Sequence, residues 1–216
     1  MQKLTEAEEL LRQDGLWAIE KEKYSQGHTY VAGIDEAGRG PLAGPVFAAC
    51  VILPKGCIIN GINDSKKLSP KKRDELFDII CEKALCYNIS SVDEKIIDEI
   101  NILNATYLAM NKAGEGMKIQ PDFVLIDGNS IKNMTIPHQT VVKGDSKSIS
   151  IAAASILAKV SRDRYITKLA ETYPQYGFEN HKGYGTAQHN EAILKYGPSP
   201  IHRQTFLKKL LGREMK

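Results

Sequence analysis

Short apolar runs that alternate with longer, helix-patterned segments constrain the fold more than any other feature of this 216-residue chain. Residues 30–34 and 46–53 form two such runs on either side of a Gly/Pro-rich connection, and each is typical of a buried strand. Further strands are predicted at residues 87–92, 123–127 and 139–142. Strands that alternate with helices indicate an α/β fold around a mixed sheet with helices on its faces.

The helical segments carry recognisable start signals and interruptions. Ser69 followed by Pro70 provides an N-cap and a first-turn proline, both favoured at the beginning of a helix. Asn101 interrupts an otherwise helical pattern, and the segment from Ser148 to Tyr173 contains neither Gly nor Pro. Helices are therefore predicted over residues 71–85, 94–117 (broken at Asn101), 148–173, 189–196 and 204–211.

These elements predict one packed unit with three parts. Residues 1–28 form an N-terminal helical extension, residues 29–172 form the core, and residues 173–216 form a loop-rich segment with short helices that packs with the core. The helical pattern of residues 4–24 is interrupted near Asp14-Gly15. We expect the extension to dock on the body of the protein.

Composition narrows the class of protein only modestly. The 42% of hydrophobic residues is enough for a sizeable core, and the formal charge of +3 permits nucleic-acid binding without indicating it. The N-terminus lacks the apolar core of a signal peptide, and no run approaches the roughly 18 apolar residues of a membrane span. We expect a cytoplasmic protein without membrane contact. Reduced, structural thiols are expected at Cys50, Cys57, Cys81 and Cys86, which include no Cys-x-x-Cys pair.

Asp35 and Glu36 stand where the first apolar run is predicted to stop, just before a sharp Gly-rich turn. Two adjacent carboxylates repel each other, and a divalent cation is their natural partner. Successive strand residues point to opposite faces, so both acids reach one ion only if the strand twists or bulges there. This pair is the first candidate metal site.

Two further acids stand in similar positions. Asp127 ends the apolar run at residues 123–127, and Asp145 precedes the longest predicted helix. Taken alone, Asp127 fits an ordinary Asp-Gly turn and Asp145 fits a helix-entry acid. Together with the first pair they predict an all-oxygen cluster at strand and helix ends, where α/β folds gather ligand sites. Carboxylates without His or Cys suit Mg²⁺ or Mn²⁺, and two such ions support phosphodiester hydrolysis without a side-chain nucleophile.

Longer motifs follow one another around these acids. They are GIDEAGRGPLAGPV at 33–46, DSKKLS at 64–69, NILNATYLAM at 101–110, VLIDGN at 124–129, VVKGDSKSISIAAASILAKVSRDR at 141–164 and YPQYGFENHKGYGT at 173–186. In this order they resemble the ribonuclease HII family of type 2 ribonucleases H, from about residue 30 to residue 206. The resemblance implies a ribonuclease H-like mixed sheet flanked by helices, with a helical C-terminal extension.

The resemblance also implies roles for individual residues. It assigns two divalent ions, Mn²⁺ or Mg²⁺, to the catalytic carboxylates Asp35, Glu36, Asp127 and Asp145. It assigns contact with the 2′-OH of a ribonucleotide and the adjacent phosphate, largely through the backbone, to Gly38, Arg39 and Gly40. Tyr184 is expected to stack at the junction. These roles fit general chemistry, because glycines let a main chain approach closely and the 2′-OH distinguishes RNA from DNA.

The reaction implied is endonucleolytic cleavage of the RNA strand of RNA/DNA hybrids and of single ribonucleotides embedded in duplex DNA. The cut is expected on the 5′ side of the ribonucleotide, leaving 3′-OH and 5′-phosphate ends. Arg39, where the related ribonuclease HIII usually has lysine, and the short N-terminal extension favour the HII type. We expect a role in removing misincorporated ribonucleotides, with hybrid and ribonucleotide-containing DNA as partners of a monomeric enzyme.

Other residues have both a functional and a structural interpretation. Lys66 and Lys147 are predicted to neutralise substrate phosphates, as are Lys67, Lys143 and Lys182, although each also fits a solvated surface lysine. Arg162 and Arg164 either pair with Asp163 along the helix or contact DNA. His181 either orders the substrate side of the site or is structural. Surface or structural roles are expected for Trp17, as a packing anchor, and for His28, His138, His189 and His202.

Two alternatives stay open at this stage. Another two-metal nuclease, such as a junction-resolving enzyme, would share the carboxylates but ignore the 2′-OH. A non-catalytic hybrid-binding protein would use the acids to hold a structural ion. No clamp-binding motif is evident near the C-terminus, and the basic segment 207–216 fits either an amphipathic helix or a frayed tail.

Overall fold

A five-stranded mixed sheet forms the centre of the protein in a computed structural model that describes residues 5–212. The strands are β1 (Val31–Ala37), β2 (Val46–Ile52), β3 (Cys86–Val92), β4 (Phe123–Asp127) and β5 (His138–Val141), in the spatial order β3-β2-β1-β4-β5. Strand β1 pairs antiparallel with β2 and parallel with β4, and β4 pairs parallel with β5. The predicted α/β fold with a mixed sheet is confirmed.

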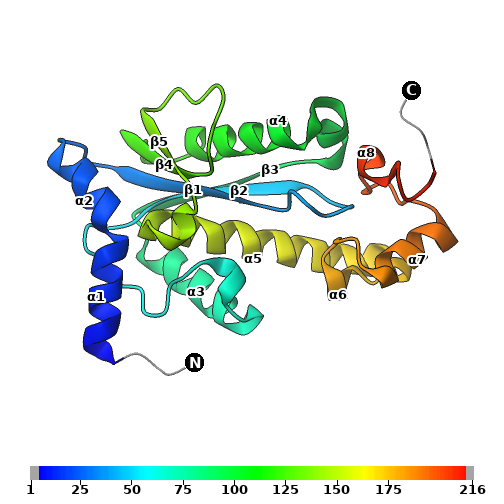
Figure 1. Ribbon diagram of the computed structural model, residues 1–216, viewed down its shortest axis with the longest axis horizontal. Helices are drawn as coiled ribbons and strands as arrows, with labels where there is room; N and C mark the ends of the chain where they lie inside the picture. Colours follow the sequence, from blue (N-terminus) through cyan, green and yellow to red (C-terminus); the bar gives the residue numbers. More distant parts are fainter. Residues whose placement is uncertain (1–4, 213–216) are drawn as a thin grey trace.

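Helices cover both faces of this sheet (Figure 1). The helices are α1 (Glu6–Leu16), α2 (Ala18–Ser25), α3 (Pro70–Lys83), α4 (Glu94–Glu115), α5 (Ile149–Thr172), α6 (Phe178–His181), α7 (Ala187–Tyr196) and α8 (Gln204–Leu207). Short 3-10 turns lie at η1 (Ser65–Lys67), η2 (Gly144–Ser146) and η3 (Pro174–Tyr176). Helix α4 covers one face and α3 with α5 the other, while α6 to α8 gather beyond one end of the sheet.

The alternation of side chains along the strands explains the two-sided core. On β2, Ala49 and Val51 pack with α3 and α5, whereas Ala48 and Cys50 pack with α4. Helix α5 lies so close to β1 that a Cβ on Gly33 would come 2.1 Å from the carbonyl carbon of Ser150. This backbone-to-backbone approach requires glycine and fixes α5 directly beneath the strand that carries Asp35.

Capping side chains begin the predicted helices where the sequence indicated. The Ser69 hydroxyl accepts a hydrogen bond from Lys72 N and begins α3, and the Ser148 hydroxyl accepts one from Ile151 N and begins α5. Asn101 has φ 65° and ψ 164° inside α4, which confirms the predicted break. The predicted helices and strands therefore all occur, although the ends of several of them differ.

Three predicted boundaries are wrong. Strand β1 does not stop before Asp35 but continues to Ala37, because its pairing with β2 persists to Ala37 and Phe47. The N-terminal helices meet at Trp17, since Asp14 and Gly15 lie inside α1. Helix α8 ends at Leu207 and gives way to turns up to residue 212. Leu4 and the last four residues of the basic C-terminal segment, two parts of the earlier predictions, lie outside the described residues.

The N-terminal helices dock through buried polar contacts. The Trp17 indole is 4% exposed and donates from Nε1 to the carbonyl of Cys57 at 3.1 Å, which confirms its packing role. The Gln13 side chain accepts a hydrogen bond from Ile59 N at 2.9 Å. Glu20, fully buried, reaches the first turn of α5. The division of the chain into three parts stays a prediction.

Three buried histidines form a cluster that joins α6, α7 and the segment before α8. Nε2 of His189 is 3.0 Å from Nε2 of His202, and the ring of His181 stacks on that of His189 with centroids 4.3 Å apart. All three side chains are buried and pack with Phe178. The structural interpretation of His189 and His202 is therefore confirmed, whereas the rings of His28 and His138 are partly or fully exposed.

The four cysteines are free, as predicted. No helix within residues 5–212 combines the length and the apolar character needed to cross a membrane.

Candidate active site

Asp35 and Glu36 lie next to each other near the end of β1. Their backbone register with Ala49 and Ala48 is regular, without the bulge that a shared ion was expected to need. The two side chains therefore leave the strand toward opposite faces. Asp35 is 5% exposed and faces α5 and Ser155, whereas Glu36 lies 3.3 Å from the guanidinium of Arg39.

Asp127 and Asp145 reach the same end of the sheet from different elements. Asp127 ends β4, the parallel neighbour of β1, so its carboxylate lies beyond the same edge as Asp35. Its Oδ1 accepts a hydrogen bond of 2.6 Å from Gly144 N, which ties β4 to the turn η2. Asp145 is 7% exposed within that turn, just before α5. Parallel pairing and this one hydrogen bond bring the four acids into one region.

Burial and neighbouring carboxylates raise the pKa values of Asp35, Glu36 and Asp145. Burial, followed by the charges of Glu36 and Asp127, raises the pKa of Asp35 well above its ordinary value. Burial also raises the pKa of Glu36 despite the lowering effect of Arg39. The pKa of Asp145 is raised by burial and by the neighbouring carboxylates of Asp64 and Asp127. Such a cluster is costly when ionised and is stabilised by cations.

The donor set fits hard divalent ions. Carboxylate oxygens without thiolate or imidazole match Mg²⁺ and Mn²⁺, and a dication would remove the repulsion that raises these pKa values. Within residues 5–212, however, no three His, Cys, Asp or Glu side chains have the spacing of a site closed around one metal ion. The acids are thus close enough to influence one another electrostatically, but their side chains do not converge on one ion position.

Asp64 and Lys66 join this cluster, and Asp64 was not among the predicted site residues. Asp64 caps η1 by accepting from Lys66 N at 2.9 Å, and its carboxylate lies beside that of Asp145. Burial lowers the pKa of Lys66, but the charges of Asp35, Asp145, Asp64 and Asp127 outweigh it and raise that pKa. Both residues belong to the motif DSKKLS. The sequence did not show the role of Asp64, because an acid beside lysines in a loop also fits an ordinary surface position.

The glycine-rich loop and Tyr184 line one cavity with Asp35 and Glu36, whereas Asp127 and Asp145 are not among its lining residues. The cavity has a volume of about 520 Å³. It is lined by Asp35, Glu36, Gly38, Arg39, Gly40, Ser65, Lys66, Ser155, Lys159 and Tyr184, among others. Gly38 has φ 100°, a conformation that other residues rarely adopt, so the turn there depends on glycine. The predicted loop, stacking tyrosine and Lys66 therefore surround the same space as Asp35.

Lys147 does not lie with these residues. It is exposed after η2 and lines a different depression, together with Arg12, Asn63 and Lys67. Lys143 is also exposed, in a left-handed conformation with φ 56°. Of the lysines proposed from sequence, Lys66 lines the cavity with Asp35, and Lys67 lies 3.9 Å from the carboxylate of Asp64.

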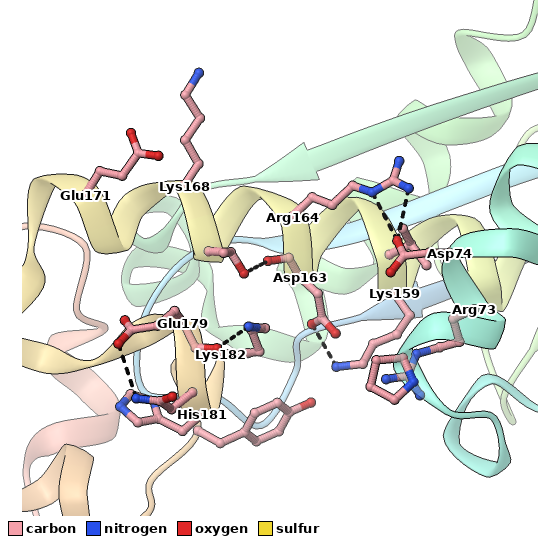
Figure 2. Close-up of a pocket in the computed structure, with 15 residues that line it drawn as sticks. Arg73, Asp74, Lys159, Asp163, Arg164, Lys168, Glu171, Glu179, His181 and Lys182 are labelled. Carbon is pink, nitrogen blue, oxygen red and sulfur yellow. Dashed lines mark hydrogen bonds and ion pairs between the residues drawn. The ribbon is translucent and has the colours of Figure 1, made fainter.

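A second, larger groove of about 780 Å³ adjoins the cavity and shares Lys159 and Tyr184 with it. Figure 2 shows its lining along α5, with Lys159 directed to Asp163 and Arg164 directed to Asp74. Basic and acidic side chains alternate here, so the groove is not a uniformly positive surface. Of the two alternatives for Arg162 and Arg164, the ion pair with Asp163 does not occur, because the described partner of Asp163 is Lys159 at 2.8 Å and Arg164 pairs with Asp74.

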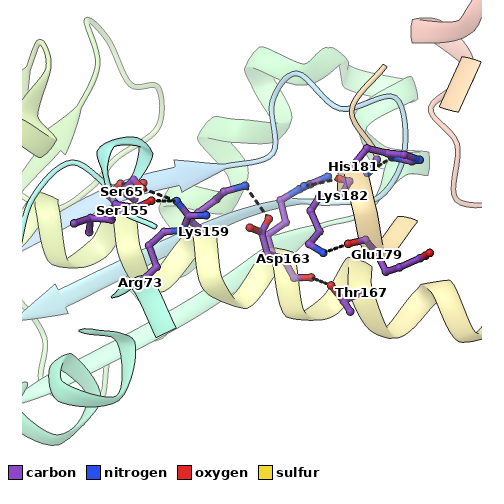
Figure 3. A network of polar contacts seen from close by, with 12 residues as sticks. Ser65, Arg73, Ser155, Lys159, Asp163, Thr167, Glu179, His181 and Lys182 are labelled. Carbon is purple, nitrogen blue, oxygen red and sulfur yellow. Dashed lines mark hydrogen bonds and ion pairs between the residues drawn. The ribbon is translucent and has the colours of Figure 1, made fainter. Parts of the chain in front are cut away.

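A network of polar contacts includes residues that line the cavity and the groove (Figure 3). Ser155 donates to the hydroxyl of Ser65 at 2.7 Å, and the Arg73 guanidinium donates to the carbonyls of Ser65 and Leu68. These bonds hold the η1 loop, and with it Lys66, against α5 and α3. His181 accepts from Gly183 N at 3.2 Å and so shapes the loop before Tyr184.

Comparison with known proteins accounts for this combination of fold and site. The family model described as ribonuclease HII matches residues 32–209. The chain belongs to the ribonuclease HII family. The ribonuclease HII of Caldicellulosiruptor bescii is 54% identical over 203 residues, which cover 94% of this chain and 98% of that protein. The ribonuclease HII of Clostridioides difficile is 58% identical over 193 residues, or 89% of this chain and 76% of that protein.

Solved structures agree with the assignment to ribonuclease HII. The ribonuclease H2 of Pyrococcus horikoshii has a TM-score of 0.71 and 30% identity, covering 86% of this chain and 98% of that one. A ribonuclease HIII solved in complex with Mn²⁺ shares the fold with a TM-score of 0.65 at 18% identity, covering 85% and 69%. The chain is therefore a ribonuclease H, a divalent-metal-dependent endonuclease for RNA in RNA/DNA hybrids.

Proposed function

We propose that this ribonuclease HII cuts at single ribonucleotides embedded in duplex DNA as well as in longer RNA/DNA hybrids. The cut falls on the 5′ side of the ribonucleotide and leaves 3′-OH and 5′-phosphate ends. The observation that carries the proposal is the shared cavity, which is lined by Gly38, Gly40 and Tyr184 together with buried Asp35. A site that reads one 2′-OH needs its recognition loop within one nucleotide of its catalytic acids.

Two divalent ions, Mg²⁺ or Mn²⁺, are proposed to be held by Asp35, Glu36, Asp127 and Asp145. When bound, such ions supply an activated water and stabilise the charge on the departing oxygen. Asp35 and Asp145 contribute from buried positions, which strengthens their attraction for cations. Glu36 must exchange its contact with Arg39 for the ion, and Arg39 is then free to meet a phosphate.

The remaining residues bind and orient the substrate in this proposal. The backbone of Gly38, Arg39 and Gly40 approaches the 2′-OH, and Tyr184 stacks at the junction of ribonucleotide and deoxyribonucleotide. Lys66 offsets the charge of the scissile phosphate. The proposed biological role is the removal of misincorporated ribonucleotides from DNA by a monomeric, cytoplasmic enzyme.

Labelled duplexes that differ by one embedded ribonucleotide test the proposal directly. Each is incubated with Mg²⁺, with Mn²⁺ or with a chelator, and the products are sized against markers with defined ends. Metal-dependent cleavage 5′ of the single ribonucleotide is expected. Cleavage of long hybrids alone would move the activity toward the HIII type, and equal cleavage of all-DNA junctions would refute ribonucleotide recognition.

A further inference from the structure

Two buried arginines hold the loop that the proposed function uses to read the substrate. Arg162 comes from α5 and Arg203 from the segment just before α8, and both are 0% exposed. Between them lies the loop of residues 38–45. We call Arg162 and Arg203 the arginine clamp.

Arg203 binds the carbonyls of the loop at both of its ends. Its Nη2 donates to the carbonyl of Gly38 at 2.6 Å and its Nη1 to that of Arg39 at 2.9 Å. Its Nε donates to the carbonyl of Gly44 at 2.9 Å. One planar guanidinium thus fixes the orientation of the first and last peptide groups of the turn.

Arg162 joins this loop to the one that carries Tyr184. Its Nε and Nη2 donate to the carbonyls of Pro45 and Ala43 at 3.2 and 3.1 Å. Its Nη1 donates to the carbonyl of Lys182 at 3.1 Å, two residues before Tyr184. A Cβ on Gly38 would come 2.1 Å from Arg162 Nε, so the glycine is required by the clamp as well as by its backbone conformation.

The charges of the clamp have no carboxylate partner within 4.0 Å in the described part of the chain. Burial and the charge of Arg162 lower the pKa of Arg203 to about 9, and burial lowers that of Arg162, so Arg203 still carries its proton at neutral pH. Six backbone carbonyls compensate for lost hydration. Two buried cations behind Gly38 and Arg39 also make the cavity side of this loop more favourable for an anion.

We propose that Arg162 and Arg203 are positioning residues that set the loop of residues 38–45 for recognition of the ribonucleotide and its phosphate. The clamp orients the peptide groups from the side away from the cavity and fixes their distance from Tyr184. This inference rests on the proposed function, because it assigns the selectivity of that same site to residues that do not touch the substrate.

Binding selectivity separates this role from simple stabilisation. The variants Arg203→Lys and Arg162→Lys keep a cation but cannot donate to three carbonyls in one plane. Arg12→Lys, on α1 and far from the loop, is the matched control. Fluorescence anisotropy with Ca²⁺ measures the affinity for two duplexes, one with a single ribonucleotide and one of DNA alone. Product formation is followed separately on a gel. Calorimetric titration of the free protein gives its Mn²⁺ affinity, and thermal melts establish that each variant is folded.

The wild-type protein and Arg12→Lys are expected to prefer the ribonucleotide duplex, and the clamp variants to lose that preference by about tenfold or more, with unchanged Mn²⁺ affinity. A folded clamp variant with the wild-type preference overturns the inference. If Arg203→Lys does not fold, Arg162→Lys decides the question on the same criterion. A wild-type protein without any preference overturns the proposed function, and the inference with it.

Discussion

Glu20 on α2 and Ser148 at the start of α5 are joined by a hydrogen bond of 2.5 Å from the Ser148 hydroxyl to Glu20 Oε1, although 128 positions separate them. The same oxygen accepts from Ser150 N at 3.1 Å. Asp145 stands three residues before Ser148, so the N-terminal helices are connected through one carboxylate to the turn that holds a candidate metal ligand. Oε2 of Glu20 is buried and has no partner among residues 5–212.

Removal of this carboxylate is expected to destabilise the protein. Glu20→Ala removes the buried acceptor that the hydroxyls of Ser148 and Ser150 and the backbone N–H of Ser150 share, at a cost of about 1–3 kcal/mol in the free energy of unfolding. Glu20→Gln keeps one acceptor oxygen and is expected to lose less. Urea unfolding measures both, with Glu22→Ala on the exposed side of the same helix as the control. Equal stability of Glu20→Ala and the control would refute a structural role for the contact.

Replacement of Asp35 by Asn is expected to abolish cleavage without unfolding the protein. The pKa of Asp35 is raised, chiefly by burial, so its stabilising contribution is complete only below the unfolded-state pKa and is lost as pH rises through the folded-state pKa. Ionisation of this buried side chain is therefore unfavourable without metal, and Asn removes that cost. Melting curves with Mn²⁺ or chelator should show an equal or higher melting temperature without metal and a smaller rise with Mn²⁺.

Asp14→Asn, on the exposed surface of α1, serves as the control for the Asp35 experiment and should keep both activity and the metal-induced rise. Normal cleavage by Asp35→Asn would show that the cluster around Asp35 is not the catalytic centre.

Much of this site was predictable because strand ends and helix starts leave local signals. Asp127 and Asp145 were placed at such ends from the sequence, and Ser148 was placed at the start of α5. The end of β1 was misplaced because the pairing of β2 with β1 extends the strand through two acidic residues that locally indicate a stop. Strand pairing of this kind depends on a distant segment.

The arginine clamp could not be predicted for a different reason. Arg162 and Arg203 donate to backbone carbonyls, and a carbonyl has no side-chain identity that a sequence pattern can reveal. Arg162 stood in a helix beside Asp163, where an intrahelical ion pair or a DNA contact was the local expectation. Because the C-terminal segment buries Arg162, its side chain neither pairs with Asp163 nor reaches DNA.

Loss of the Tyr184 ring is expected to weaken substrate binding. The side chain is 42% exposed, with Lys159 Nζ 5.6 Å from the ring centroid, so an aromatic surface is available beside a cation. Tyr184→Ala should raise KM by roughly tenfold or more, because base stacking on an aromatic ring contributes about 1–3 kcal/mol. Tyr184→Phe keeps the ring and should stay within a few-fold of wild type. Steady-state kinetics with a single-ribonucleotide duplex would measure this.

Tyr87→Ala removes a similarly exposed tyrosine from the edge strand β3 and should leave KM unchanged. An equal effect of the Tyr87 and Tyr184 substitutions would argue against stacking at this site.

The histidine cluster is expected to make stability fall with acidity. Burial lowers the pKa values of both His189 and His202 to about 4, and for His202 the neighbouring His189 lowers it further. The unfolded chain takes up these protons near pH 6.5, so stability present above that pH is lost as pH falls toward 4, by at most about 1.4 kcal/mol per pH unit and histidine. Chemical unfolding of wild type and His202→Gln across this range measures the free energy of unfolding of each. The difference between the two free energies should become smaller at low pH.

His138→Gln, on the exposed strand β5, supplies the control because its difference from wild type should not change in the same way. A constant difference between wild type and His202→Gln from pH 7 to pH 4 would contradict the assigned pKa shifts.

The close approach of Gly33 to Ser150 limits how this sequence can diverge. Any other amino acid at position 33 would drive β1 away from α5 and separate Asp35 from Ser155. No substitution at this position is therefore expected to be neutral. Gly15, with nothing within 4 Å of an added Cβ, is open to it. A mutational library selected for activity should therefore retain glycine at 33 and accept alanine at 15. The packing of β1 against α5 thus depends on a single residue.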